Sequence, residues 1–212
     1  MKRLALIMFC LSLYLPTSPS SQIIQQLATR LQSYTTLHMR FEQIYSSLTV
    51  SQPQREKGQL YYQKPGLMRW EYTSEEKRVY LIKDNLLWEY LPEENQLVIY
   101  DLTSKDFNQT LLSLLSGKLA LENNYQLSLL PPTGTNFYRL HLKPLQEESE
   151  YEQIEIEVSR KNWLIHRVVF LDWAGNKTEF IFKDIKINRP LSTDIFQLKL
   201  PPDIEIIDYR KK

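Results

Sequence analysis

The residue types that most often carry out catalysis are dispersed along this sequence rather than grouped. Its three histidines, His38, His141 and His166, lie in separate segments and show no spacing typical of a metal site. No Gly-x-Ser-x-Gly motif marks a nucleophilic serine, and the single cysteine is Cys10. We therefore predict that the protein is not an enzyme and that it uses neither a metal ion nor a cofactor.

The clearest pair of neighbouring carboxylates is Glu155 and Glu157. These residues alternate with Ile154, Ile156 and Val158, which is the period of two that a β-strand requires. The alternation favours a strand with one solvated face over a pair of acid–base groups.

The most informative stretch is an aromatic hairpin at residues 58–72. The tripeptide Lys64-Pro65-Gly66 predicts a turn, because proline presets φ and glycine permits the positive φ that follows. One face of the two flanking strands carries five apolar or aromatic residues: Leu60, Tyr62, Met68, Trp70 and Tyr72. Either a protein core or a ligand has to cover such a face.

Hydrophobic periodicity divides the chain after residue 20 into two helices and a series of strands. A period of three to four residues predicts a helix over 21–34 and another around 107–117, which includes Phe107, Leu111 and Leu115. Eleven strands are predicted: 37–50, 58–63, 67–72, 78–83, 86–91, 96–100, 125–130, 136–142, 151–158, 163–172 and 177–187. Because short turns join consecutive strands, we expect one domain, residues 21–212, built as an antiparallel meander curled on itself.

Residues 1–20 have the composition of an export signal. Two basic residues precede an apolar run from Leu4 to Leu15, and proline, threonine and serine follow it. A membrane-spanning helix needs about 20 apolar residues, so we predict a signal peptide cleaved before Ser21, with a single-pass anchor as the alternative. Cys10 lies inside the run and lacks the small preceding residues of a lipid-attachment site.

The overall charge argues against nucleic acid as a partner. The 26 basic residues are balanced by 25 acidic ones, so the basic surplus of nucleic-acid-binding proteins is missing.

The aromatic residues of the strands admit two interpretations. By pattern alone, an ordinary barrel or sandwich core explains them. Large rings in place of branched aliphatic side chains, together with two leucine-rich helices, point instead to a covered cavity. The residues concerned are Tyr62, Trp70, Trp88, Tyr90, Phe170, Phe180 and Phe182.

The order of several short motifs resembles the LolA family of periplasmic outer-membrane lipoprotein carriers. The motifs span almost the whole chain after the signal: Phe41-x-Gln43, Gly58-x-Leu-x-x-x-Lys-Pro-Gly-x-Met-x-Trp70, Asp84-Asn-x-x-Trp88-x-Tyr90, Leu140-x-Leu-x-Pro144, and Phe196 ahead of a Pro-Pro pair. The resemblance implies a mainly β fold with an α lid, in which short helices cover an incomplete, strongly curved antiparallel β-barrel of about eleven strands. It also implies a carrier that holds the acyl chains of lipoproteins in a hydrophobic cavity. Such a carrier ferries them from an inner-membrane ABC exporter to the outer membrane, through a lipoprotein receptor where one is present.

The resemblance matches Leu27 and Leu31 to lid positions on the first helix and Met68 and Trp70 to apolar hairpin positions, and the alternation of the strands and the helical stripes extend these two sets. The acyl-chain cavity is assigned to Leu60, Tyr62, Met68, Trp70, Trp88, Tyr90, Ile154, Ile156, Phe170, Phe180 and Phe182. The lid is assigned to Ile24, Leu27, Leu31, Leu111 and Leu115. Lys64 is the latch candidate, because the family commonly has arginine just before the turn proline, where it bonds the lid closed. Lysine lacks the planar donor fork of arginine, so we expect a looser latch.

Two other functions are compatible with the same pattern. A periplasmic sensor or scaffold domain would bind a protein partner on the same curved sheet. An outer-membrane-anchored receptor would need a lipidated cysteine, and the surroundings of Cys10 disfavour this. We favour the carrier, which we expect to be a monomer in the periplasm.

Overall fold

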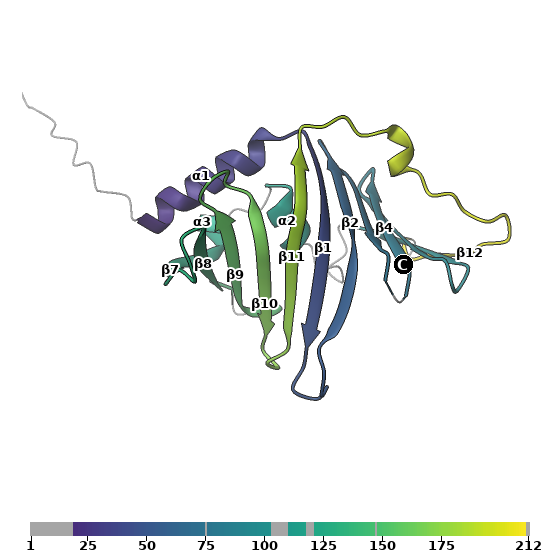
Figure 1. Ribbon diagram of the computed structural model, residues 1–212. Coiled ribbons are helices and arrows are strands. Elements are labelled where there is room, and N and C mark those ends of the chain that lie inside the picture. Colours follow the sequence, from purple (N-terminus) through teal and green to yellow (C-terminus); the bar gives the residue numbers. More distant parts are fainter. Residues whose placement is uncertain (1–18, 75, 103–109, 118–120, 147, 211–212) are drawn as a thin grey trace, which may run out of the picture.

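The computed structural model describes residues 19–74, 76–102, 110–117, 121–146 and 148–210, which form a curved sheet with helices on one side of it (Figure 1). Most of the predicted signal peptide, including Cys10, lies outside these ranges, and so does Phe107 of the predicted second helix.

The elements follow the predicted order closely. The first half of the chain contains α1 (Pro19–Ser33), β1 (Thr36–Ser46), β2 (Gln54–Gln63), β3 (Leu67–Tyr72), β4 (Arg78–Lys83), β5 (Leu86–Leu91) and β6 (Gln96–Asp101). The second half contains α2 (Thr110–Leu115), α3 (Leu121–Asn124), β7 (Tyr125–Leu130), β8 (Phe137–Pro144), β9 (Tyr151–Ser159), β10 (Ile165–Asp172), β11 (Lys177–Ile187), the 3₁₀ turn η1 (Thr193–Phe196) and β12 (Glu205–Asp208).

Within the described ranges all strands join one sheet of twelve, in the order β12-β6-β5-β4-β3-β2-β1-β11-β10-β9-β8-β7. Strand β1 lies in the middle because it pairs with β2 on one side and with β11, from the end of the chain, on the other. The sheet is therefore two antiparallel meanders joined along β1, and its edge strands β7 and β12 stand at opposite ends of the strand order. This open, curled sheet with short helices confirms the predicted fold class.

The strand count needs one correction. We predicted eleven strands in an antiparallel meander, and the structure adds β12, which pairs with β6 in parallel. Four residues are too few to show a clear alternation, so the sequence does not reveal this strand. Its pairing with Gln96–Ile99 identifies it.

The main core fills the concave face of the sheet. Helix α1 lies across one end of that face, with α3 beside it, and α2 sits within the curve (Figure 1). The apolar stripe of α1 is buried against the sheet at Ile23, Ile24, Leu27 and Leu31, and the predicted helix period is thereby explained.

A second, smaller core lies on the convex face of β3 to β6. Here the segment around η1 crosses the strands, and the Arg69 guanidinium donates to the backbone oxygen of Ile195 at 3.4 Å. Phe196 is 5% exposed, and Leu81 of β4 is equally buried. Both faces of this part of the sheet are therefore covered by protein.

The covered convex face overturns the predicted orientation of β5. Trp88 pairs with Leu81 and Tyr90 pairs with Val79, and paired residues share a face, so both aromatic rings lie on the convex side. Leu87 is the β5 residue that faces the concave side. The prediction that Trp88 and Tyr90 line the cavity was wrong, because β5 also carries apolar Leu87 on its other face and alternation alone cannot say which face is concave.

Candidate functional site

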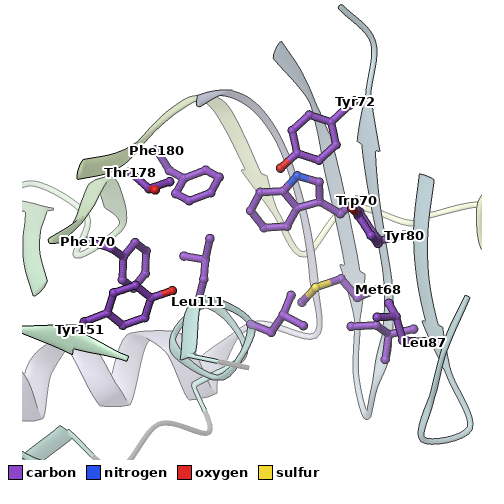
Figure 2. Close-up of a pocket in the computed structure, with 12 residues that line it drawn as sticks. Met68, Trp70, Tyr72, Tyr80, Leu87, Leu111, Tyr151, Phe170, Thr178 and Phe180 are labelled. Carbon is purple, nitrogen blue, oxygen red and sulfur yellow. The ribbon is translucent and has the colours of Figure 1, made fainter. Parts of the chain in front are cut away.

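A cleft of about 240 Å³ opens on the concave face between β3–β5 on one side and β9–β11 on the other (Figure 2). Helix α2 contributes Leu111, which projects between the two walls (Figure 2). The lining is almost entirely apolar or aromatic: Met68, Trp70, Tyr72, Tyr80, Ile82, Leu87, Leu111, Leu112, Tyr151, Phe170, Thr178 and Phe180.

The structure brings only part of the predicted cavity set to this cleft. Four predicted cavity residues line it: Met68, Trp70, Phe170 and Phe180. Five others lie in the packed part of the same concave core, each exposed by 2% or less: Leu60, Tyr62, Ile154, Ile156 and Phe182. They are on the predicted face of the sheet but too deep to border the cleft.

Sequence reasoning missed several lining residues on the neighbouring strands. Tyr80 is the cross-strand partner of Trp70, and Ile82 is the partner of Met68. Extending the alternation of the hairpin across to β4 identifies both, because directly paired residues point to one face. Thr178 is identified in the same way, because it lies two residues before Phe180 on β11 and pairs with Phe170. Tyr151 carried no such signal, because it is out of phase with Ile154 and Ile156 and pairs with Asp172 beyond a register shift.

Aromatic rings form a continuous wall along the cleft. The ring of Trp70 lies 4.8 Å from Phe41 and 5.4 Å from Phe180, measured between centroids. On the other side, Phe170 lies 4.7 Å from Tyr151. These tilted and edge-on contacts are the favourable geometries for aromatic pairs and hold the wall in a defined shape.

The polar groups of the cleft are few and uncharged. Burial raises the pKa of Tyr72 to about 12 and raises the pKa values of Tyr80 and Tyr151 well above their usual range, so the hydroxyls stay protonated. The Tyr72 hydroxyl donates to Gln43 Oε1 at 2.5 Å. The buried Trp70 Nε1 has no hydrogen-bond partner among the described residues. The cleft therefore suits an uncharged, apolar ligand.

Helix α2 is tied to the end of α1 by a buried hydrogen bond. The hydroxyl of Tyr34, which is 1% exposed, donates to the carbonyl oxygen of Leu115. Just beyond α2, Gly117 has φ +71°, and a Cβ there would lie 3.0 Å from Leu31 Cβ. Both the closeness of Leu31 and the positive φ favour glycine at position 117. The C-terminal end of α2 therefore lies directly against α1.

The predicted lid residues are all buried in the concave core. Of the five, Leu111 alone lines the cleft, whereas Leu115 packs behind it on α2. The three α1 residues, Ile24, Leu27 and Leu31, are exposed by 4% or less. The predicted lid residue at the cleft is therefore on α2, whereas those of α1 lie in the packed core.

The latch candidate Lys64 does contact α1. Its ammonium group donates to the backbone oxygen of Gln32 at 2.5 Å and lies 5.8 Å from the centroid of the Tyr34 ring. Lys64 thus joins the β2–β3 turn to the last turn of α1.

The histidines are apart from the cleft and have separate partners. His38 stacks on Tyr61, with ring centroids 4.4 Å apart, and the His141 ring hydrogen-bonds Gln153. In the part of the chain that the structure describes, no three His, Cys, Asp or Glu side chains gather as a metal site. Nor does any helix there have the length and apolarity to cross a membrane.

Comparisons with known proteins agree with this architecture. The family model described as outer membrane lipoprotein carrier protein LolA matches residues 32–199. An outer-membrane lipoprotein carrier protein of Pseudomonas aeruginosa is 26% identical over 187 residues, which cover 88% of each chain. One from Azotobacter vinelandii is 24% identical over 205 residues, covering 96% of this chain and 95% of the relative.

Two solved structures share the fold. An uncharacterized conserved protein from Thermus thermophilus has a TM-score of 0.58 at 15% identity, covering 90% of this chain and 99% of that chain. MucB of Pseudomonas aeruginosa, in its complex with MucA, has a TM-score of 0.53 at 14% identity, covering 86% of this chain and 62% of that chain.

Proposed function

Because this chain belongs to the LolA family of outer-membrane lipoprotein carrier proteins, we propose that it carries lipoproteins through the periplasm with their acyl chains in the concave cleft. The observation that carries the proposal is the chemistry of the cleft. Its twelve lining residues include no carboxylate, ammonium or guanidinium group, and its tyrosines are held neutral by burial. A hydrocarbon chain that enters such a site leaves water and displaces few hydrogen bonds of the lining.

The size of the cleft implies that α2 moves when cargo enters. A volume of about 240 Å³ lies below the ~300–1,000 Å³ of ordinary ligand pockets, so the cleft as it stands accommodates only part of an acyl chain. Displacing Leu111 and Leu112 is the direct way to enlarge it, because both side chains project into the cleft from one short helix.

Energetics favours partial burial of the cargo. Three chains of ~16 carbons, fully buried at ~0.8 kcal/mol per methylene, would gain ~38 kcal/mol. That exceeds the ceiling of ~20 kcal/mol for noncovalent binding, and such a cargo would not be released. A carrier therefore buries part of its cargo, or uses some of the binding energy to move α2. Met68, a flexible and polarisable side chain, suits a wall that adapts to different chains.

The proposal also covers the export signal, the mature protein and its partners. Residues 1–20 act as the export signal, and the mature protein begins near Ser21 as a periplasmic monomer without enzymatic activity. Its partners are the inner-membrane ABC exporter that supplies lipoproteins and an outer-membrane receptor, where one is present. Intact-mass measurement of the periplasmic protein tests whether the mature chain begins near Ser21. A lipid-modified Cys10 at the N-terminus would refute this prediction.

A pair of tryptophan variants tests the cleft. Trp70→Glu places a charge in the cleft, whereas Trp88→Glu places the same charge on the convex face, outside it. We expect a fluorescent fatty acid to bind the wild type and the Trp88 variant, and to bind the Trp70 variant at least about tenfold more weakly. Thermal unfolding of both variants serves as the control for folding. Equal affinities in the two variants would place the ligand elsewhere.

The alternative function is a scaffold that binds a protein on the same sheet. MucB, which shares the fold, has been solved in complex with MucA. Native mass spectrometry of the protein isolated from the cell envelope separates the two functions. A bound diacyl or triacyl mass supports the carrier, whereas a bound protein without lipid supports the scaffold.

A further inference from the structure

An exposed apolar surface lies at the end of the sheet remote from the β2–β3 turn and the Lys64 contact with α1. It consists of Leu48 and Val50 in the β1–β2 loop and Trp173 in the β10–β11 loop, and we call it the hairpin-tip surface. These side chains are exposed by 85%, 41% and 61%, respectively. The two loops extend side by side from the sheet (Figure 1), and they are so close that a Cβ at Gly175 would lie 3.3 Å from Leu48 Cδ1.

The β1–β2 tip of the hairpin-tip surface carries no charged residue. Residues 43–54 form twelve consecutive positions without a Lys, Arg, Asp or Glu, in a chain of which 24% is charged. In the other loop, residues 173–176 are also uncharged. On the β1–β2 side the first charges are paired, Arg55 with Glu42 at 2.9 Å. On the other side, the carboxylate of Asp172 directly precedes Trp173, and Glu148 and Glu150 flank Ser149, which accepts the Trp173 Nε1 hydrogen bond.

Several polar groups near these tips already have hydrogen-bond partners within the protein. Trp173 Nε1 donates to the backbone oxygen of Ser149 at 2.7 Å, while its ring stays exposed. The carboxylate of Asp172 accepts the backbone N–H groups of Ala174 and Asn176. In the β1–β2 loop the Val50 amide donates to the carbonyl oxygen of Ser47. Burial of these groups consequently breaks few hydrogen bonds with water.

The cleft extends to the same end of the sheet. Thr178, which lines the cleft, lies three residues after Gly175 of the β10–β11 loop. Tyr151, also in the lining, pairs with Asp172 at the foot of that loop. Two other contacts lie at the opposite end of the strands: the hydrogen bond from Tyr34 to α2, and the hydrogen bond from Lys64 to α1.

We propose that the hairpin-tip surface docks on the interfacial region of a lipid bilayer and brings the end of the cleft against it. Tryptophan and leucine beside uncharged serine, threonine and glutamine suit the boundary between headgroups and acyl chains. A stable protein interface takes about 20–30 residues a side, and two short loops offer far fewer. The contact with lipid is therefore weak and reversible, as a shuttling protein requires.

The role of this docking in cargo transfer rests on the proposed function, whereas the docking itself does not. Each methylene of a cargo chain that is exposed to water slows its transfer by about fourfold, taking ~0.8 kcal/mol per methylene. A cleft whose end is pressed to the bilayer shortens that exposed length. Docked protein accordingly exchanges acyl chains with vesicles faster than protein in free solution.

The test uses vesicles of phosphatidylcholine brominated on the acyl chains, which quench tryptophan that enters the interface. We expect strong quenching of the wild type and much weaker quenching of Trp173→Phe, which keeps Trp70 in the cleft and still cosediments with the vesicles because phenylalanine keeps the apolar contact. The double variant Leu48→Ser/Trp173→Ser should cosediment at least about tenfold less. The matched control is Ile206→Ser, a 56% exposed apolar residue on β12 at the far edge of the sheet, and it should behave as the wild type.

Three outcomes overturn the proposal. They are quenching of Trp173→Phe equal to that of the wild type, cosedimentation of the double variant equal to that of the wild type, and binding that requires anionic lipid and disappears in high salt. The last would indicate electrostatic attraction instead of apolar docking. Binding of a fluorescent fatty acid without vesicles is measured on the same variants. If the wild type docks but binds no fatty acid, the carrier function fails and the docking stands; if it binds fatty acid but does not dock, the reverse holds.

Discussion

Removal of the Tyr34 hydroxyl tests whether α2 gates the cleft. In Tyr34→Phe the ring that packs beside α1 is kept, and only the donor to the Leu115 carbonyl is lost. Because Tyr34 is 1% exposed, water does not readily replace the donor while α2 is closed. When α2 is displaced, the carbonyl reaches water in the wild type and in the variant alike. The substitution therefore raises the free energy of the closed state selectively.

The size of the effect follows from the cost of an unsatisfied buried acceptor. That cost is about 1–3 kcal/mol, which shifts the closed-to-open equilibrium by ~5- to 150-fold. If cargo leaves through the open state, its dissociation rate rises by the same factor. Stopped-flow dissociation of a fluorescent fatty acid from the purified protein measures it directly.

The matched control is Tyr61→Phe, which removes a hydroxyl that donates to Gln59 Oε1 at 2.8 Å, away from α2. We expect this variant to release the fatty acid at the wild-type rate. A Tyr34→Phe protein that unfolds at a lower temperature but releases ligand at the wild-type rate would refute the gate. The hydrogen bond would then be a structural element only.

Three further predictions follow from the same contacts. Fatty-acid binding should change tryptophan emission in Trp88→Phe as in the wild type, and much less in Trp70→Phe, because only Trp70 lines the cleft; an equal change in both variants would contradict the geometry. Lys64→Met should speed ligand release by ~2- to 5-fold through loss of the partly exposed bond to Gln32, and Lys64→Arg should slow release, as dissociation rates will show. Burial raises the pKa of Tyr72 to about 12, so the unfolded chain, with a tyrosine pKa near 10, loses its proton first. The contribution of Tyr72 to stability is thus complete below pH ~10 and falls between pH ~10 and ~12, and urea unfolding of Tyr72→Phe should show a smaller alkaline loss.

The local pattern of the sequence was enough to place the strands, the first helix and the aromatic hairpin. Alternation is a property of neighbouring residues, and Lys64-Pro65-Gly66 carries its own turn chemistry, so both could be read without the rest of the chain. The same reasoning correctly put Met68 and Trp70 on the concave face. The resemblance to the LolA family supplied the open barrel and the lid, which periodicity alone does not specify.

Only the tertiary structure decided which apolar face is which and how deep each residue lies. Trp88 and Tyr90 of β5 lie on the convex face, away from the cleft, and the segment around η1, far along the chain, covers that face. The tie between Tyr34 and Leu115 and the contact of Gly175 with Leu48 also join segments distant in sequence. Alternation fixes a side chain relative to its own strand, whereas burial and proximity depend on which remote segment packs there. Those choices are made when the sheet curls, and no stretch of the sequence contains them by itself.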